Sequence, residues 1–420
     1  MSHSPNSAPL EVGATLILDV ERLAADGEAV ARAPDGRIVF LWGAAPGDRV
    51  EVVVEAVKKR HARARVLRRL ADGPDRVPPA CPLVETCGGC PWQGISRGTQ
   101  LDALARHVAH LLQRSTGQAV EVEAVPTLEG LAWRSTARLH WKDARLGYRG
   151  HRDDAIIDVA SCPVLAPPLP TLLATVRARL MPVLRGTGTL RLSAGPGAAA
   201  GTVYLAGALP PAVVSAARAL VGAPGCQGVV IDCTGKDRER RGQTENLVQG
   251  VLHPAEAFMQ AHGPGTAALI AAVVERAGPP GPVLDLFAGS GAFTLALAQR
   301  GHRVTAVEEV GVAARCLKRQ IGELPVEVVT GDANRPPRQP DGQPYPVAVL
   351  DPPRAGAAGA VAGLHAAGTR RLLYIACDPA TLARDAGWLV ARGWQVREAL
   401  VFDLFPHTGH VETLLVLERP

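Results

Sequence analysis

The sequence predicts an α/β protein with an open, doubly wound sheet in its C-terminal part, preceded by a small OB-type β-barrel and a mixed α+β middle domain. Two observations support this fold class. From Val283 onward, apolar runs of strand length alternate with helical stretches, as in a mostly parallel sheet. Between about Gly13 and Leu70, short alternating segments follow one another between turns, which is typical of a small barrel.

Length and composition allow two or three domains. The chain has 420 residues, and we expect the barrel at 9–70, the middle domain at 81–255 and the α/β domain at 256–420. The 45 basic and 40 acidic residues nearly balance, so the net charge of +5 indicates little by itself.

No export signal or membrane span is expected. The first residues are polar and lack the basic start and apolar core of a signal peptide. The longest uncharged run, Leu192 to Ala217, is interrupted by glycines and by Pro210 and Pro211. We therefore expect a cytoplasmic protein, whose eight cysteines serve as ligands, nucleophile and core residues rather than as disulfides.

The predicted barrel ends in a basic strand. Five strands are expected, separated by turns at Asp26-Gly27, Asp35-Gly36 and Pro46-Gly47-Asp48. From Lys58 to Arg69 the chain holds seven lysines and arginines and no acidic residue. This density indicates a surface that faces phosphates, and the alternative is the solvated face of a strand.

A cysteine motif opens the middle domain. Cys81, Cys87 and Cys90 form a C-x5-C-x2-C pattern, and Cys162, which like Cys81 precedes a proline, is the candidate fourth ligand. Four thiolates can hold a [4Fe-4S] cluster or a tetrahedral zinc ion. The tight spacing around two glycines favours the cluster, because backbone amides can turn toward sulfur, and zinc is the alternative.

A second basic segment follows. Its cations alternate with Trp133, Trp141 and Tyr148, as on a surface that stacks bases and holds phosphates. These cations are Arg134, Arg138, Lys142, Arg145, Arg149 and Arg152. The alternation also suits the wet side of a sheet. Between the two segments, Ser96 to Arg114 has the apolar spacing of a packing helix.

The glycine turn of the C-terminal domain predicts a nucleoside site. A strand feeds Gly289 and Gly291, and the next strand ends in Glu308, 19 residues after Gly289, where a carboxylate can bind ribose hydroxyls. Thr294 stands where a dinucleotide-binding turn has its third glycine, which argues against a pyrophosphate. With Asp285 before the turn, the pattern favours S-adenosylmethionine.

Three further strand ends carry chemical groups. Asp332 and Asp351 follow two strands, and Cys377 follows a third, while Glu412 opens the last strand. A thiolate that adds to C6 of uracil makes C5 nucleophilic toward a methyl donor, and a base must then remove the C5 proton. We predict Cys377 as the nucleophile and Glu412 as the base; a core cysteine and a solvated carboxylate are the plain alternatives.

The motifs FMQ, DLFAGSGAF, VLDPPRAG, YIACDPATLARD and FPHTGHVETL, in this order, resemble the RNA 5-methyluridine methyltransferase family. The barrel resembles the TRAM domain of that family, and the cysteine spacing resembles its cluster-bearing 23S rRNA uracil-C5 members. The resemblance implies a Rossmann-like methyltransferase domain with the catalytic pair Cys377 and Glu412. The S-adenosylmethionine contacts that it implies, together with the glycine turn, are Gln260, Phe287, Gly289, Gly291, Glu308, Asp332 and Asp351.

Two positions depart from the family pattern, since His262 stands in the place of an Asn and Ala292 in a place that is often Asn. The expected substrate is RNA, with ribosomal RNA favoured and transfer RNA as the alternative, and the expected state is a monomer. Two other hypotheses remain open. They are a radical S-adenosylmethionine enzyme, against which the cysteine spacing argues, and a non-catalytic RNA-binding protein.

Overall fold

The computed structural model describes residues 10–24, 27–127, 130–142, 144–151, 155–233 and 238–420. The chain divides into two compact units. Unit 1 consists of Met1–His107, Gly150–Arg152 and Phe405–His410. Unit 2 consists of Val108–Arg149, Asp153–Leu404 and Val411–Pro420. Within the described residues, no helix combines the length and the apolar character that a membrane crossing requires.

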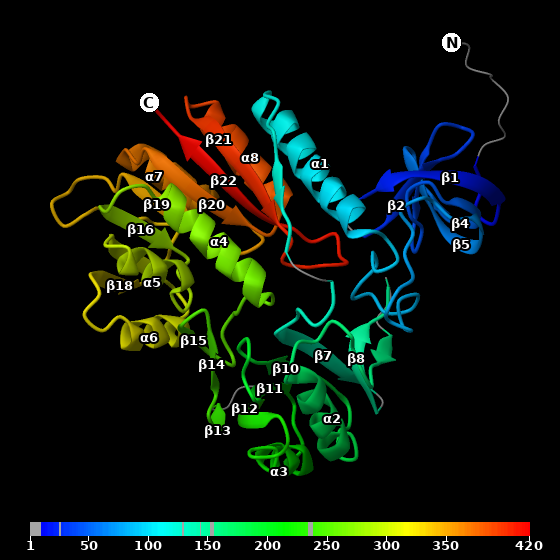
Figure 1. Ribbon diagram of the computed structural model, residues 1–420, viewed down its shortest axis with the longest axis horizontal. Helices are drawn as coiled ribbons and strands as arrows, with labels where there is room; N and C mark the ends of the chain where they lie inside the picture. The colour runs from blue at the N-terminus through cyan, green and yellow to red at the C-terminus, as the bar shows by residue number, and fades with distance from the viewer. Residues whose placement is uncertain (1–9, 25–26, 128–129, 143, 152–154, 234–237) are drawn as a thin grey trace. The chain divides into compact units, whose positions relative to one another are not determined.

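Unit 1 contains the predicted barrel (Figure 1). Its sheet closes in the order β1-β2-β3-β5-β4, because the last and first strands also pair. The strands are β1 (Thr15–Leu23), β2 (Ala29–Arg32), β3 (Ile38–Leu41), β4 (Arg49–Val57) and β5 (His61–Ala71). Alternate residues point inward, and Val39, Leu41 and Val50 are fully buried. The five expected strands are confirmed; Asp26, in one of the expected turns, lies outside the described residues.

A buried glutamine ties the remaining segments of unit 1 together. Helix α1 (Arg97–Thr116) begins where the packing helix was expected, and the side chain of Gln100 is 1 % exposed. Its amide nitrogen donates to the carbonyls of Trp92 and Ile95, and its oxygen accepts the backbone N–H of His407 at 3.0 Å. The loop that precedes Glu412 is therefore anchored on the segment that follows the cysteine motif.

The middle part of the chain forms a seven-stranded sheet in the order β13-β12-β11-β10-β7-β8-β9. The helices α2 (Leu169–Leu180) and α3 (Pro211–Arg218) pack together and against β10 and β12, respectively. The strands are β7 (Thr136–Lys142), β8 (Arg145–Arg149), β9 (Ile156–Asp158), β10 (Thr187–Ser193), β11 (Gly201–Gly207), β12 (Cys226–Cys233) and β13 (Glu239–Gly242). A hairpin of β14 (Glu245–Val248) and β15 (Val251–Pro254) follows.

The C-terminal sheet has eight strands in the order β18-β17-β16-β19-β20-β22-β21-β6. The strands from β16 to β20 run parallel to one another, and β22 runs antiparallel to both of its neighbours. They are β16 (Pro282–Leu286), β17 (Arg303–Glu308), β18 (Val326–Thr330), β19 (Val347–Leu350), β20 (Arg371–Ala376), β21 (Gln395–Phe402) and β22 (Glu412–Glu418). The edge strand β6 (Glu123–Val125) was placed in the middle domain by the sequence, yet it pairs with β21.

The strand order reverses between β16 and β19, which is the switch point of a doubly wound sheet. Right-handed crossovers then put the helices that follow β16 and β17 on one face and those that follow β19 and β20 on the other. Figure 1 shows α4 in front of this sheet. The helices are α4 (Gly263–Arg276), α5 (Ala292–Gln299), α6 (Gly311–Gln320), α7 (Ala358–Ala367) and α8 (Pro379–Val390).

Candidate active site

The strand register brings Cys377 and Glu412 together. Cys377 directly follows β20, and Glu412 is the first residue of the antiparallel strand β22. Ala376 pairs with Thr413, so the next pair along the same register is Cys377 and Glu412. Asp351 directly follows β19, the parallel neighbour of β20, and thus lies at the same edge.

The thiol of Cys377 is half-buried between a strand end and a helix start. Asp378 caps α8, because its carboxylate accepts the N–H groups of Ala380 and Thr381 at 3.0 Å. The pKa of Cys377 is raised to about 11, chiefly by burial and secondly by the charges of Glu412 and Asp351, while Arg354 acts in the opposite direction. The thiol is consequently protonated at neutral pH, and Arg354 is the cation that favours its ionisation.

The carboxyl group of Glu412 is buried and, like the thiol of Cys377, is influenced by the charge of Asp351. The residue is 2 % exposed, and burial, with Asp351 as a second cause, raises its pKa well above the usual value. Gln260 donates a side-chain hydrogen bond to it. Within the described residues, Oε1 of Glu412 and Oε1 of Gln260 are buried without a hydrogen-bond partner. Buried acceptors of this kind fit a polar ligand.

The predicted nucleoside site lies at the next strand ends. Both oxygens of Glu308 accept backbone N–H groups, one from Gly289 at 2.7 Å and one from Val310 at 2.6 Å. Thr294, in the place of the third glycine, donates its hydroxyl to Asp285. Burial raises the pKa of Asp285 to about 7, and Glu308 adds to this shift. Thr294, which stands in the place of the third glycine, therefore has a structural role, because its hydroxyl binds the buried carboxyl group of Asp285.

The backbone of the turn leaves room for a ligand. Phe287 and Gly291 have φ angles of 63° and 99°, and a Cβ on Gly291 would meet Leu317 at 2.3 Å. A Cβ on Gly289 would meet nothing within 4 Å, so the turn is open on that side. An open glycine whose backbone N–H is bonded to the carboxylate of Glu308 leaves space for a ligand at this strand end.

Three other predicted or divergent positions lie in a helix cap, a loop and a helix start. His262 is the N-cap of α4, and its Nδ1 accepts the N–H of Gly265 at 2.9 Å. Asn is also a favoured N-cap, so the substitution preserves this role. Asp332 lies at the expected edge but is exposed and bonds Asn334 in its own loop. Ala292 is the first residue of α5.

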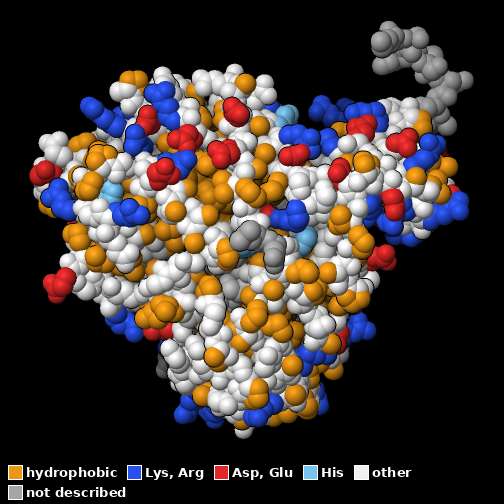
Figure 2. Space-filling view, viewed as in Figure 1, with side chains coloured by type: hydrophobic (Ala, Val, Ile, Leu, Met, Phe, Trp, Pro, Cys, Tyr) orange, Lys and Arg blue, Asp and Glu red, His pale blue; other side chains and the backbone are white. Residues whose placement is uncertain are grey.

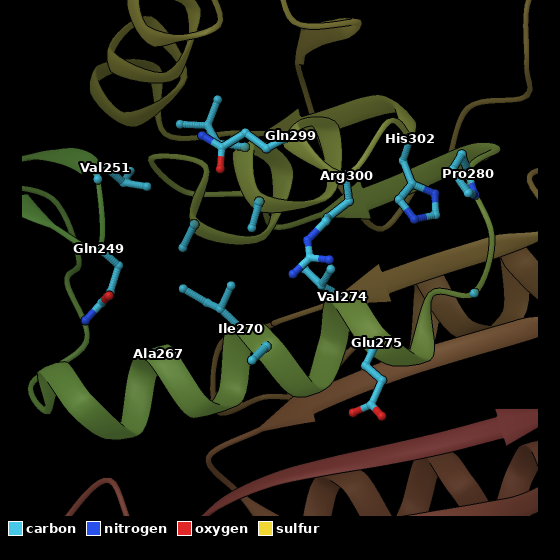
Figure 3. Close-up of a pocket in the computed structure, with 16 residues that line it drawn as sticks. Gln249, Val251, Ala267, Ile270, Val274, Glu275, Pro280, Gln299, Arg300 and His302 are labelled. Carbon is cyan, nitrogen blue, oxygen red and sulfur yellow. The ribbon is translucent and has the colours of Figure 1, made fainter.

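A cavity of about 690 Å³ lies elsewhere, between α4 and α5. Figure 3 shows Arg300 and His302 at one end of it and Gln249 at the other. None of the predicted catalytic and cofactor-binding residues lines this cavity. The candidate site is therefore defined by the strand edge and not by the cavity.

The structure places the cysteine motif on tight turns. The N–H of Cys87 donates to the carbonyl of Leu83 at 2.8 Å. A Cβ added to Gly89 would lie 3.4 Å from Sγ of Cys87, so the backbone of Gly89 is close to this sulfur. Cys81, Cys87 and Cys90 belong to unit 1, and Cys162 belongs to unit 2. The described part of the chain shows no group of three or more His, Cys, Asp or Glu side chains arranged for a metal.

Two expectations about the basic segments need correction. In β5, Arg63, Arg65 and Arg68 pair with Glu28, Glu55 and Glu51, so the run is less charged than its sequence indicates. Figure 2 shows acidic and basic side chains interspersed over the barrel. Among the described residues of this run, three exposed cations have no acidic partner. All three lie in the β4–β5 turn: Lys58, Lys59 and Arg60.

In the second segment, Trp133 and Trp141 are 5 % and 2 % exposed, so they cannot stack on bases. Trp141 packs over Gly188, where no Cβ would fit, and Trp133 stacks on His262. Arg138 and Lys142 remain exposed on β7. Arg152 lies outside the described residues. The prediction of aromatic base stacking by the two tryptophans was wrong, because Trp141 lies on the buried face of β7 and Trp133, before that strand, is buried against His262.

Sequence reasoning missed two buried polar residues on the elements that precede and follow Cys377, β20 and α8. Tyr374 and Asp385 are buried and bond to each other at 2.7 Å, close to the loop that carries Arg354. A polar residue at a core position of an apolar helix was the available signal for Asp385.

Comparison with known proteins agrees with this geometry. Residues 9–67 match the TRAM domain, and residues 344–420 match the tRNA (Uracil-5-)-methyltransferase family. The 23S rRNA (uracil(1939)-C(5))-methyltransferase RlmD of Chromohalobacter salexigens is 34 % identical, over 96 % of this chain and 89 % of its own length. The RlmD of Klebsiella pneumoniae strain 342 is 32 % identical, over 94 % of this chain and 93 % of its own.

A solved structure shares the fold. The Pyrococcus abyssi tRNA (uracil-54, C5)-methyltransferase, in complex with S-adenosyl-L-homocysteine, aligns with a TM-score of 0.76 and 22 % identity, over 96 % of this chain and 100 % of its own. The fold and the site define a methyltransferase with an N-terminal TRAM barrel. The chain belongs to the RNA (uracil-C5)-methyltransferase family.

Proposed function

We propose that this chain methylates C5 of one uridine in 23S ribosomal RNA, with S-adenosylmethionine as the methyl donor. The observation that carries the proposal is the β20–β22 register: its last pair is Ala376 with Thr413, so the next residues along each strand, Cys377 and Glu412, are adjacent at the sheet edge that also carries the glycine turn. The names of the relatives favour ribosomal over transfer RNA, and the cytoplasm is then the site of action. Because Gln260, Asp351, Cys377 and Glu412 all come from one chain, a monomer suffices.

The thiolate of Cys377 adds to C6 of the uracil, and the electron pair of the C5–C6 double bond moves into the ring carbonyl to give an enolate. C5 of this enolate takes the methyl group of S-adenosylmethionine; the bond between that methyl group and the sulfonium sulfur breaks, and S-adenosylhomocysteine leaves with the electron pair. Glu412 then takes the C5 proton, the C5–C6 double bond forms again, and the C6–Sγ bond breaks to return the thiolate. The target base must leave its stack to reach the strand edge.

The electrostatics of the site suit these roles. A raised pKa makes the ionised carboxylate of Glu412 a stronger base toward the C5 proton, and the amide of Gln260 fixes its orientation. A raised pKa likewise makes the thiolate of Cys377 more nucleophilic, while Arg354 supplies the positive charge that helps it to form. Lys58, Lys59, Arg60, Arg138 and Lys142 are exposed cations that suit RNA phosphates.

The proposed substrate predicts that a cell without this protein lacks 5-methyluridine at one position of its ribosomal RNA. Deleting the gene should remove 5-methyluridine from one position of 23S ribosomal RNA and leave transfer RNA unchanged, as measured by mass spectrometry of nuclease fragments. Restoring the wild-type gene should restore the nucleoside, and restoring the Cys377→Ala variant should not. Loss of 5-methyluridine from transfer RNA instead would overturn the ribosomal assignment and keep the chemistry.

We further propose that Cys81, Cys87, Cys90 and Cys162 hold a [4Fe-4S] cluster rather than zinc. The set of four thiolate donors fits iron and sulfide, and the tight turns around Cys87 and Gly89 bring backbone close to sulfur. No step of the methyl transfer requires this group.

The cluster proposal predicts about four iron and four sulfide ions per chain after anaerobic purification. Replacing Cys90 by Ser should lower both counts to a small fraction, whereas the same change at Cys233, outside the motif, should leave them unchanged. Metal and sulfide analysis measures this result. One zinc ion per chain and no sulfide would contradict the cluster assignment.

A further inference from the structure

Asp385 is a buried carboxylate that the chemistry above does not use. It lies on α8 and is 2 % exposed. One oxygen accepts the hydroxyl of Tyr374 at 2.7 Å and the backbone N–H of Ala357 at 3.0 Å. The other oxygen accepts the guanidinium of Arg384 at 2.8 Å. A buried carboxylate with this many donors holds its neighbours firmly, because each donor would lose a charge-assisted bond if it moved.

These partners connect the two segments that flank the thiol. Tyr374 lies three residues before Cys377 on β20, and Ala357 ends the loop from Asp351 that carries Arg354. The Tyr374 hydroxyl also bonds the N–H of Ala357 at 3.0 Å, which closes a small network. Asp385 therefore links the strand of the nucleophile to the loop of the cation beside it.

Helix α8 adds further contacts to the same loop. The hydroxyl of Thr381 donates to the carbonyl of Arg354 at 3.3 Å, and Arg384 donates to the carbonyl of Ala355 at 3.2 Å. Gly356 has a φ of 80°, and a Cβ there would meet Arg384 at 2.6 Å and Asp385 at 3.0 Å. The loop is thus fitted closely onto α8, and its shape depends on the position of Asp385.

We propose that Asp385 is a positioning residue that holds Arg354 beside the thiol of Cys377 and so controls how readily the nucleophile forms. The backbone of Arg354 lies against the first turn of α8, because its carbonyl accepts the hydroxyl of Thr381, four residues after Cys377. Of the charged groups that act on the thiol, Glu412 and Asp351 oppose its ionisation and Arg354 promotes it. If Arg354 moved away, the negative charges of Glu412 and Asp351 would act on the thiol without this opposing positive charge, and the thiolate would form less readily. The inference rests on the proposed function only in its choice of Cys377 as nucleophile.

The test measures the thiol itself and needs no RNA. Alkylation of Cys377 by iodoacetamide at pH 8, followed by peptide mass spectrometry, reports the thiolate fraction, because only the thiolate reacts. Asp385→Asn keeps the size of the side chain but replaces an acceptor by a donor. We expect it to slow alkylation of Cys377 by roughly tenfold, which corresponds to a rise of about one pKa unit.

Two comparisons make the result specific. Asp48 in the barrel is also a buried carboxylate bonded to an arginine and two backbone N–H groups, so Asp48→Asn is a matched control that should not slow Cys377 alkylation. Arg354→Gln should slow alkylation, and Asp385→Asn added to it should slow it no further. If Asp385→Asn proves unstable, Tyr374→Phe removes one bond of the network and should give a smaller change in the same direction.

Two outcomes would overturn the proposal. One is an unchanged alkylation rate in a folded Asp385→Asn variant. The other is an equal slowing by Asp385→Asn with and without Arg354, which would show an effect independent of the arginine. The first outcome would overturn the proposal even if the variant had lost RNA methylation. Failure of the ribosomal RNA assignment would leave the alkylation results intact, so the two can be told apart.

Discussion

Replacing Cys377 by Ala should reduce methyl transfer by roughly four orders of magnitude or more. C5 of uracil is too weak a nucleophile to attack a sulfonium methyl group unless C6 has first been substituted. The alanine variant cannot form that bond, while Glu412 and the glycine turn remain in place. Transfer of labelled methyl groups from S-adenosylmethionine to RNA measures the loss, with long incubations to detect residual activity.

Controls must show that the Cys377→Ala variant loses methyl transfer because it lacks the thiol and not because it is misfolded. Cys233, at the end of β12, is also half-exposed and lies outside the site, so Cys233→Ala should retain the wild-type rate. The Cys377→Ala variant should still bind S-adenosylmethionine by calorimetry, because no cofactor contact is assigned to the thiol. Methylation by this variant at more than about one per cent of the wild-type rate would refute a covalent mechanism through Cys377.

Replacing Glu412 by Gln should stop the reaction after methylation. The amide cannot take the C5 proton, so the C6–Sγ bond cannot break, and turnover should fall by about 10²–10⁴-fold. Protein and RNA should then migrate together on a denaturing gel when S-adenosylmethionine is supplied. Because the raised pKa of Glu412 means that its carboxylate forms only as pH rises, release of the wild-type adduct should accelerate with increasing pH.

A matched control lies on the same strand. Glu418 ends β22 and pairs with Arg371 and Arg397 at the far end of the sheet. Glu418→Gln should accumulate no adduct and should turn over normally. Adduct in equal amounts in both variants would indicate a general disturbance of β22 and would remove the assignment of Glu412 as the base.

Local sequence patterns were sufficient to predict most of the fold. Apolar alternation and turn residues predicted the five barrel strands, and the acidic or thiol residues at strand ends predicted one chemical edge. These predictions succeeded because parallel strands place their carboxyl ends at one edge of the sheet. A residue that directly follows such a strand in the sequence therefore lies at that edge. Asp351 and Cys377 follow parallel strands and reach one edge in this way, whereas Glu412 reaches it because it opens the antiparallel strand β22.

Long-range packing was not predictable in the same way. The strand β6 joins the C-terminal sheet through three pairs with β21, and nothing in its short sequence specifies that partner. The acidic partners of Arg63 and Arg65 are Glu28, just before β2, and Glu55 on β4, so the sequence of the basic run alone could not show that these charges are neutralised. The bonds of Asp385 likewise join segments that are separated in sequence, and only the folded chain brings them together.

The central claim concerns the atom that bonds the RNA, and it is tested most directly by digesting the Glu412→Gln adduct with protease and nuclease and sequencing the joined peptide by mass spectrometry. The account predicts a single modified peptide, in which Cys377 carries a nucleotide whose mass includes the added methyl group. Attachment through any other residue, or a nucleotide without the methyl group, would contradict it.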